Sequence, residues 1–261
     1  MKTVIQVWTH RCINIPDCFF WGLGDILRGT IQLYQFCKKN NYNFIVDIQL
    51  HNLSNHLVNH SHEFSQIIKN NKYNIQFVCM KEIEQYVGNN TNDVIYFFTN
   101  GCQNFSENLD IETKLFMRDL LTPNDATKDF IVNKSSTLPI INSVLHYRLG
   151  DEELILKSNS ANMNSIVDHV MKNCEDHDIL LSDSKKFKLM VREVNNCKNL
   201  IIFETEPKHI GFESSESLND TLFEFFLMTK SKKIKTYSNY GWISGFVFWI
   251  HKIYDVPLIK M

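Results

Sequence analysis

Arginine is scarce in this chain of 261 residues. Lysine and arginine together number 27, but the arginines are limited to Arg11, Arg28, Arg118, Arg148 and Arg192. A planar guanidinium can form two parallel hydrogen bonds with a carboxylate or a phosphate, and a lysine ammonium cannot reproduce that geometry. A chain that uses lysine by default is expected to keep arginine where the fork geometry is needed. The few arginines are therefore the first candidates for anion binding.

The chain also lacks an excess of positive charge and a long apolar run. Its formal net charge is -2 at pH 7 and its pI is near 6.5, whereas a nucleic-acid-binding surface normally shows a basic excess. The longest apolar run, Trp242–Ile250, is far shorter than the roughly 20 residues that span a bilayer. The segment Met1–Trp8 becomes polar too soon for a signal peptide. We therefore expect a cytoplasmic protein with no membrane span and no nucleic-acid partner.

Several kinds of site are disfavoured by what is missing. The seven cysteines are an odd number and form no C-x-x-C pair, which indicates reduced thiols rather than a disulfide framework. No G-x-S-x-G elbow is present, which excludes a serine hydrolase of that type. A histidine cluster lacks the further ligands of a recognisable metal site, so no metal is expected. The cluster comprises His51, His56, His60 and His62, with Glu63.

Short β-rich runs alternate along the chain with amphipathic segments of helical length, which is typical of crossover units around a parallel sheet. The chain turns polar between Thr122 and Thr137, where Pro123–Asp125 could start a short helix and Lys134–Thr137 resembles a connector, so the domain boundary is placed near residue 130. The predicted fold is α/β, with two Rossmann-like domains, 1–130 and 131–261, that face each other across a cleft. The expected strands are Val4–Thr9, Asn43–Asp47, Ile75–Cys79, Val94–Thr99, Leu138–His146, Ile179–Ser182, Leu200–Glu204 and Ile234–Tyr237. The expected helices are Asp25–Lys39, Leu57–Asn70, Ile111–Leu121, Asn164–Lys172, Ser184–Asn196, Leu218–Ser231 and Gly241–Tyr254.

The segment Leu145–Asp151 places one arginine and one glycine where a buried strand stops. The preceding run, Leu138–Leu145, is apolar and β-branched, which indicates a strand buried on both faces. In open α/β sheets ligands bind outside the carboxyl ends of the strands, and a guanidinium there can hold a diphosphate. Arg148 is therefore the first functional candidate, with Gly150 beside it. The alternative is a structural ion pair between Arg148 and Asp151 or another acid.

A glycine-containing turn precedes the first long helix. Gly22 and Gly24 would let the backbone approach a ligand closely, and the start of the helix, with Asp25 and Arg28, supplies N–H groups for an anion. The turn lacks the third glycine of the dinucleotide fingerprint, so an NAD site is not expected. The alternative is a tight strand-to-helix turn that Asp25 caps.

Polar residues follow three further strands. Ser238, Asn239 and Tyr240 lie between a strand and a helix, so hydroxyl and backbone N–H groups converge there as they would around an anion. The alternative is an Asx or Ser turn that caps the helix. Asp183 could accept hydrogen bonds from a nucleobase, hold Arg148 or cap a helix. His209 is a further candidate for the same cleft.

Four motifs, in order along nearly the whole chain, resemble those of the fucosyltransferase superfamily that shares the H-x-R-R-G-D motif. This superfamily includes the α1,2-, α1,6- and protein O-fucosyltransferases and the rhizobial nodulation enzyme. His146–Asp151 matches H-x-R-R-G-D except that Leu149 replaces the second arginine. The other similar segments are Gly22–Arg28 (G-L-G-N-Q-L-R), Leu181–Asp183 (S-D-D), and Glu224–Thr229 with Tyr237–Trp242 (D-L-L-L-M-S and S-N-S-S-F-x-W).

The resemblance implies a GT-B fold and an inverting, metal-independent transfer of fucose from GDP-fucose to a glycan or another hydroxyl acceptor. The nucleotide sugar is then a substrate, and no cofactor is required. The resemblance assigns the donor diphosphate to Arg148, lets Ser238 and Asn239 close on the phosphates, and places Asp183 near the guanosine. The second domain would hold the donor and the first the acceptor. Leu149 removes one cation from the motif, which puts the donor and the activity in question.

The residue that takes the acceptor proton is left open, with Asp25, His146 and His209 as candidates. Two other functions also stay open. One keeps the fold but uses another GDP-linked sugar. The other is a non-catalytic relative that binds a nucleotide or a glycan without turnover, because a fold does not fix a function.

Overall fold

The structure is a computed structural model that describes part of the chain. The described residues are 1–8, 22–58, 80–97, 107–136, 138, 141–150, 162–194, 199–211 and 218–261. The chain forms two compact units, Met1–Asp125 with Ile210–Glu216 and Ala126–His209 with Ser217–Met261. The division falls after Asp125, shortly before the boundary expected near residue 130, and it assigns Ile210–Glu216 to the first unit.

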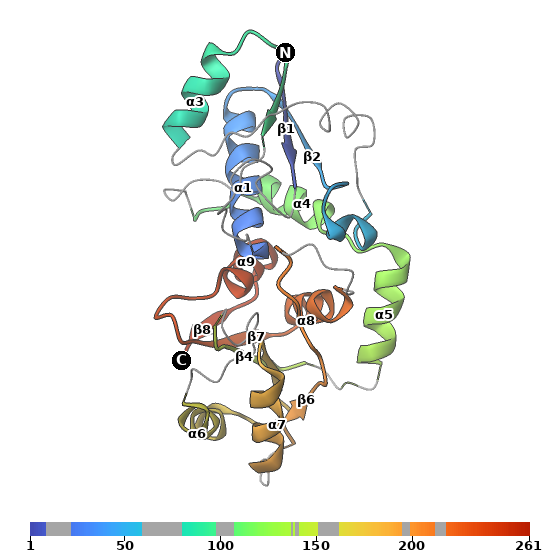
Figure 1. The fold of residues 1–261 in the computed structure, drawn as a ribbon, viewed down its shortest axis with the longest axis vertical. Helices are drawn as coiled ribbons and strands as arrows, with labels where there is room; N and C mark the ends of the chain where they lie inside the picture. The colour runs from blue at the N-terminus through green and yellow to red at the C-terminus, as the bar shows by residue number, and fades with distance from the viewer. Residues whose placement is uncertain are drawn as a thin grey trace. The chain divides into compact units, whose positions relative to one another are not determined.

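The first unit contains a parallel sheet with β1 in its middle (Figure 1). β1 (Thr3–Val7) pairs with β2 (Asn43–Asp47) on one side and with β3 (Val94–Phe97) on the other. Because the strands that follow β1 lie on opposite sides of it, the carboxyl end of β1 is a topological switch point. The helices described in this unit are α1 (Leu23–Lys39), the short 3₁₀ helix η1 (Asn52–Asn55), α3 (Met80–Asn89) and α4 (Ile111–Leu120).

The core of the first unit forms because α1 and α3 carry apolar residues at helical spacing. These residues pack against apolar side chains of β1 and β3 in one buried cluster. Its buried members are Val4, Leu33, Phe36, Cys37, Ile83, Val87, Ile95 and Phe97.

The second unit contains a larger parallel sheet with β4 (Ser143–Arg148) at its centre. β5 (Ile179–Ser182) and β7 (Lys233–Ser238) pair with β4, and β6 (Ile201–Ile202) and β8 (Leu258–Lys260) lie outside them. Figure 1 shows α6 and α7 on one face of this sheet and α8 and α9 on the other. The described helices are α5 (Asp125–Ser135), which begins at the division, α6 (Met163–Asn173), α7 (Lys185–Val194), α8 (Asn219–Thr229) and α9 (Gly245–Tyr254).

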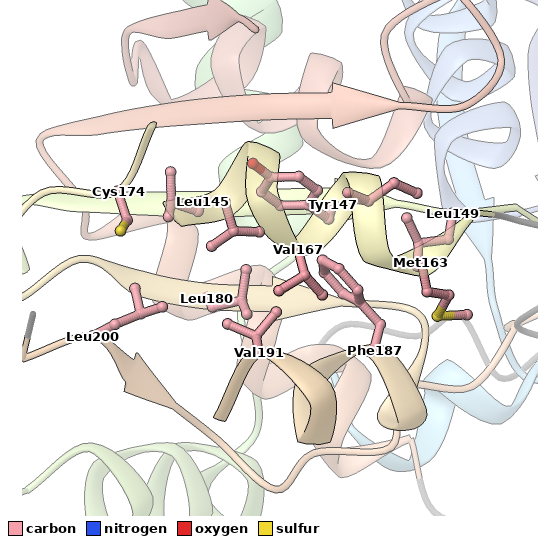
Figure 2. Packing of buried hydrophobic residues seen from close by; sticks show 12 residues of the cluster. Leu145, Tyr147, Leu149, Met163, Val167, Cys174, Leu180, Phe187, Val191 and Leu200 are labelled. Carbon is pink, nitrogen blue, oxygen red and sulfur yellow. The ribbon is translucent and has the colours of Figure 1, made fainter. Parts of the chain in front are cut away.

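Side chains alternate along β4 between the two faces of the sheet. Leu145 and Tyr147 belong to a buried cluster with residues of β5, α6 and α7 (Figure 2). His146 lies on the other face, where its ring stacks on Phe246 of α9 with 6.2 Å between the centroids. Ser143 and the next four residues are all buried. The strand is therefore covered on both faces, as its apolar sequence predicted.

The predicted α/β fold with parallel sheets is confirmed, and β2 and β5 have the predicted bounds. The strand expected over Leu138–His146 instead begins at Ser143, and Arg148 is its last residue rather than part of the following loop. The predicted first residue was wrong because an apolar run alone does not define where a strand begins. The run also contained Pro139, which has no N–H for a sheet ladder.

Other differences lie in the first unit and at the C-terminus. The prediction that a helix begins at Leu57 is wrong, because Leu57 forms an isolated antiparallel bridge with Pro123. The rest of that helix, and the strand expected over Ile75–Cys79, lie outside the described residues. The sequence did not predict η1, α3 or β8.

Candidate functional site

The carboxyl ends of β4, β5 and β7 lie together at one edge of the second sheet. Tyr147 is in register with Ser182, and Arg148 is in register with Ser238. After β4 the chain passes to β5 and β6 on one side and then to β7 and β8 on the other. The edge between β4 and β7 is therefore a topological switch point, the place where open α/β sheets bind ligands. The structure thus brings together three of the strand ends that the sequence singled out.

Arg148 forms an ion pair with Asp183 through Nη1 and Oδ2. The two side chains are 15% and 7% exposed, so the pair is largely shielded from water. The same carboxylate accepts hydrogen bonds from the backbone N–H of Leu149, at 2.8 Å, and of Gly150, at 3.1 Å. Of the roles considered for Asp183, the structure shows that it holds Arg148. The helix cap is a different residue, because the Ser184 hydroxyl accepts the hydrogen bond from the N–H of Phe187.

The turn after β4 is also held from the side of β7. The backbone N–H of Asn239 donates to the carbonyl of Arg148 at 3.1 Å, and its side-chain amide donates to the carbonyl of Leu149 at 2.8 Å. The hydroxyl of Ser238 accepts a hydrogen bond from the N–H of Tyr240 at 3.2 Å. Ser238 and Asn239 therefore form a turn. A turn that caps the following helix was one of the two alternatives predicted from the sequence. Ser238 and Asn239 do not cap α9, which begins at Gly245, later than the predicted Gly241.

Gly150 has a backbone conformation that requires glycine. Its φ of 134° is rarely adopted by residues with a side chain, and an added Cβ would lie 3.2 Å from the hydroxyl of Tyr240. The ring of Tyr240 stacks on Trp242, with 5.1 Å between the centroids and 14° between the planes. Trp242 itself is 65% exposed. Tyr240 therefore lies against Gly150, and Trp242 stacks on Tyr240.

Leu149, which replaces the second arginine of the H-x-R-R-G-D motif, is a buried residue. Its side chain is buried in the cluster that includes Tyr147, Met163 and Phe187 (Figure 2). The side chain at this position therefore lies in the core, while the backbone N–H of the same residue binds Asp183. Leu149 therefore anchors the turn by apolar burial.

His146 is buried on the face of β4 opposite to Leu149. Its Nδ1 lies 3.3 Å from the hydroxyl of Thr236 on the neighbouring strand. Burial, assisted by the positive charge of Arg148, lowers the pKa of His146 to about 3. The imidazole is therefore neutral at pH 7.

The candidates from the glycine-containing turn all lie in the first unit. Gly22 is the N-cap of α1 with an extended backbone, and Gly24 lies inside the helix, which begins two residues earlier than predicted. Asp25 does not cap the helix but pairs with Arg28, with 2.9 Å between Oδ1 and Nη2. The side chains of Arg28 and Asp25 are 30% and 43% exposed. The first turn of α1 thus carries one ion pair that partly faces solvent.

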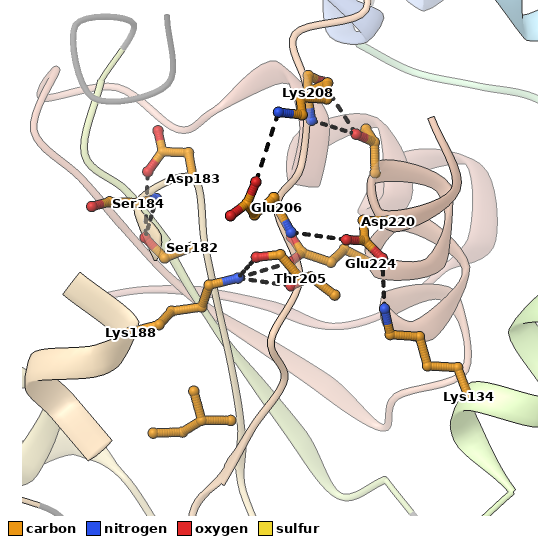
Figure 3. A network of polar contacts seen from close by, with 12 residues as sticks. Lys134, Ser182, Asp183, Ser184, Lys188, Thr205, Glu206, Lys208, Asp220 and Glu224 are labelled. Atoms are coloured by element: carbon orange, nitrogen blue, oxygen red, sulfur yellow. Dashed lines mark hydrogen bonds and ion pairs between the residues drawn. The ribbon is translucent and has the colours of Figure 1, made fainter. Parts of the chain in front are cut away.

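His209 is half-buried in the segment that follows β6 and is the last residue of that part of the second unit. A polar network attaches this segment to α7 and α8 (Figure 3). Lys188 donates to the carbonyl and the hydroxyl of Thr205, at 2.5 and 2.7 Å, and the same hydroxyl donates to Glu224. The backbone N–H of Lys208 donates to the hydroxyl of Thr221 at 2.7 Å.

Lys188 and Glu224 form a buried ion pair at the centre of this network. Their charged atoms are 3.6 Å apart, and the side chains are 3% and 4% exposed. Burial lowers the pKa of Lys188 and raises the pKa of Glu224. This pair was not predicted from the sequence. Glu224 lies inside the apolar run Leu222–Phe226, and an acid in such a run indicates a buried, paired charge.

No protein-family model matches the sequence, and no curated protein matches it. Among solved structures, the α-1,6-fucosyltransferase NodZ soaked with GDP-fucose has a TM-score of 0.60 and 11% identity, over 100% of this chain and 94% of its own. NodZ from Bradyrhizobium has a TM-score of 0.57 and 11% identity, over 100% of this chain and 96% of its own. A mutant of Arabidopsis thaliana FUT1 in complex with GDP has a TM-score of 0.56 and 10% identity, over 99% of this chain and 70% of its own. The chain has the GT-B fold of these fucosyltransferases.

The likeness at these identities is one of fold. Among the described residues, no group of three or more His, Cys, Asp and Glu side chains could hold a metal ion. None of the helices described has both the length and the apolar character needed to cross a membrane.

Proposed function

We propose that this chain is a glycosyltransferase that moves fucose from GDP-fucose, with inversion and without a metal, onto a hydroxyl of a glycan or another acceptor. The observation that supports this most strongly is the position of Arg148 at the switch point of the second sheet. The fold is shared with a fucosyltransferase soaked with GDP-fucose and another in complex with GDP. We assign the donor to the second unit and the acceptor to the first, in a cytosolic protein.

Arg148 is the group that we assign to the donor diphosphate. The backbone N–H groups of Gly150, Asn239 and Tyr240 already have acceptors within the protein. The guanidinium has five N–H donors, and Asp183 binds it at Nη1. As the bond between fucose and GDP breaks, negative charge develops on the diphosphate. A cation that is already fixed in place stabilises this charge without having to reorganise.

The acceptor hydroxyl must lose a proton, and Asp25, His146 and His209 are the candidate bases. The low pKa of His146 makes it a weak base at neutral pH, and its burial restricts its access to an acceptor. Asp25 is 43% exposed and His209 is half-buried, so both are more accessible. We therefore favour Asp25 or His209 over His146.

The test is the release of GDP from a panel of GDP-linked sugars in the presence of hydroxyl acceptors. Arg148→Ala should lower the rate of release from GDP-fucose by about 10²–10³. The matched control is Arg192→Ala, because Arg192 also forms an ion pair in this unit but with the exposed Glu204. This control should keep the wild-type rate. A preference for another GDP-sugar would replace fucose in the proposal, and equal rates for the two variants would reject Arg148 as the diphosphate ligand.

A non-catalytic binding protein is the second candidate. The observation in its favour is that Asp183 already engages the guanidinium of Arg148. Such a protein would bind GDP but release none from any GDP-sugar with any acceptor, and the same assay combined with a binding measurement distinguishes the two.

A further inference from the structure

One carboxylate receives three donors from three consecutive residues at the end of β4. Asp183 accepts from the guanidinium of Arg148 and from the backbone N–H groups of Leu149 and Gly150. Consecutive backbone N–H groups beside a cation form the kind of concave site that binds anions. Asp183 is only 7% exposed, and in Figure 3 it lies beside Ser182 and Ser184 at the start of α7. The protein therefore supplies an internal anion to this site.

The internal anion restricts the orientation of the guanidinium. Asp183 binds Arg148 at Nη1, and the guanidinium is planar. Fixing one nitrogen together with the backbone of the two following residues restricts the side chain to a narrow set of orientations. A phosphate cannot take the two backbone N–H groups while Asp183 occupies them, so an incoming diphosphate has to bind the guanidinium itself.

The backbone at this turn has further supports that do not depend on Asp183. Asn239 binds the carbonyls of Arg148 and Leu149, and the side chain of Leu149 is buried in the core. Loss of the Asp183 carboxylate should therefore release the guanidinium more than it displaces the turn. Because the turn should stay in place when the carboxylate is lost, the effect of Asp183 on the orientation of Arg148 can be measured by itself.

We propose that Asp183 is a positioning residue that orients Arg148 toward a diphosphate and does not itself contact the nucleotide. The proposal rests on the proposed function, in which Arg148 binds the diphosphate of GDP. It differs from the role that the family resemblance implied, which placed this acidic segment near the guanosine. The two roles differ in whether Asp183 affects binding of the nucleoside part.

The experiment measures binding of GDP, inorganic pyrophosphate and guanosine by calorimetry. Asp183→Asn keeps the size of the side chain but replaces one carboxylate oxygen with an N–H donor opposite other donors. It should raise the Kd for GDP and for pyrophosphate on the order of 10-fold to 100-fold, because small misplacements of a binding group have effects of this size. The Kd for guanosine should stay unchanged. In the Arg148→Ala background, Asp183→Asn should cause no further loss.

Asp176→Asn is the matched control, because Asp176 in the same unit is exposed and its carboxylate accepts a hydrogen bond from the backbone of Asn199. It should leave all three Kd values unchanged. If Asp183→Asn does not unfold cooperatively, Asp183→Glu replaces it, and this longer acid should also weaken pyrophosphate binding.

Unchanged or tighter pyrophosphate binding by Asp183→Asn would overturn the proposal, and tighter binding would make Asp183 a competitor of the phosphate. Weaker guanosine binding would make it a nucleoside contact instead. If the wild type binds pyrophosphate but not GDP, and Asp183→Asn weakens that binding, the positioning role stands and the proposed function fails. No binding of either by the wild type would overturn both.

Discussion

Replacing Leu149 with arginine restores the second arginine of the family motif, and the structure predicts that it harms the protein. Leu149 is 3% exposed and lies in the buried cluster with Tyr147, Val167 and Phe187. If a missing cation limited this site, Leu149→Arg would strengthen GDP binding. If the position is part of the core, the variant should lose stability and gain no affinity.

The expected loss of stability follows from the burial of Leu149. Overpacking a filled core costs about 1–3 kcal/mol, and enclosing an unpaired guanidinium costs several kcal/mol more. We therefore expect Leu149→Arg to lower the free energy of unfolding by on the order of 4 kcal/mol or more, a large part of the roughly 5–15 kcal/mol of a typical domain. Leu149→Met nearly conserves the volume and should cost less than about 1.5 kcal/mol.

Urea titrations followed by circular dichroism compare the stability of the two variants with that of the wild type, and calorimetry measures their GDP affinity. A Leu149→Arg variant that unfolds within about 1 kcal/mol of the wild type and binds GDP more tightly would refute this prediction. In that case the side chain at this position reaches the ligand rather than the core.

Three further predictions concern the second unit. Lys188→Met should lower the free energy of unfolding by about 3–5 kcal/mol because it leaves the Glu224 carboxylate buried without its cation, and adding Glu224→Leu should recover most of that loss in urea titrations; no recovery would contradict the buried pair. Folded His146 stays neutral down to about pH 3, whereas the unfolded chain takes up a proton near pH 6.5, so the free energy of unfolding should fall as the pH is lowered through this window. His146→Asn should reduce that slope, and an identical slope in both proteins would contradict the low pKa. Gly150→Ala should cost about 1–3 kcal/mol in thermal or urea unfolding because of its φ of 134°, whereas Gly88→Ala, at an open and exposed helix position, should be neutral or slightly stabilising; equal effects would contradict the strain.

The sequence predicted best those elements whose apolar pattern is short and sharply bounded. β2 and β5 were predicted to the residue, and the buried strand before Arg148 was recognised although its start was misplaced. α3 was missed even though Ile83, Tyr86 and Val87 have helical spacing. β8 was missed because a run of three residues at a sheet edge carries too little pattern to be distinguished from a loop.

The site could be predicted only in part, because its geometry depends on pairing between distant segments. Residue types at strand ends pointed to Arg148, Asp183 and Asn239, and the register of the parallel strands brings these ends together. The sequence could not decide which acid holds Arg148, since Asp183 is 35 residues away. It also could not show that Leu149 is a core residue, because the direction of one side chain in a turn is fixed by tertiary packing.

Titration of the protein with GDP in a calorimeter measures whether Arg148 holds the diphosphate of the donor. The wild type and the Arg192→Ala control should bind GDP equally well. Arg148→Ala should bind it on the order of 10-fold to 100-fold more weakly, as expected for the loss of hydrogen bonds from a charged group. Equal binding by Arg148→Ala, or no binding by the wild type, would contradict the claim that this guanidinium holds the diphosphate of the donor.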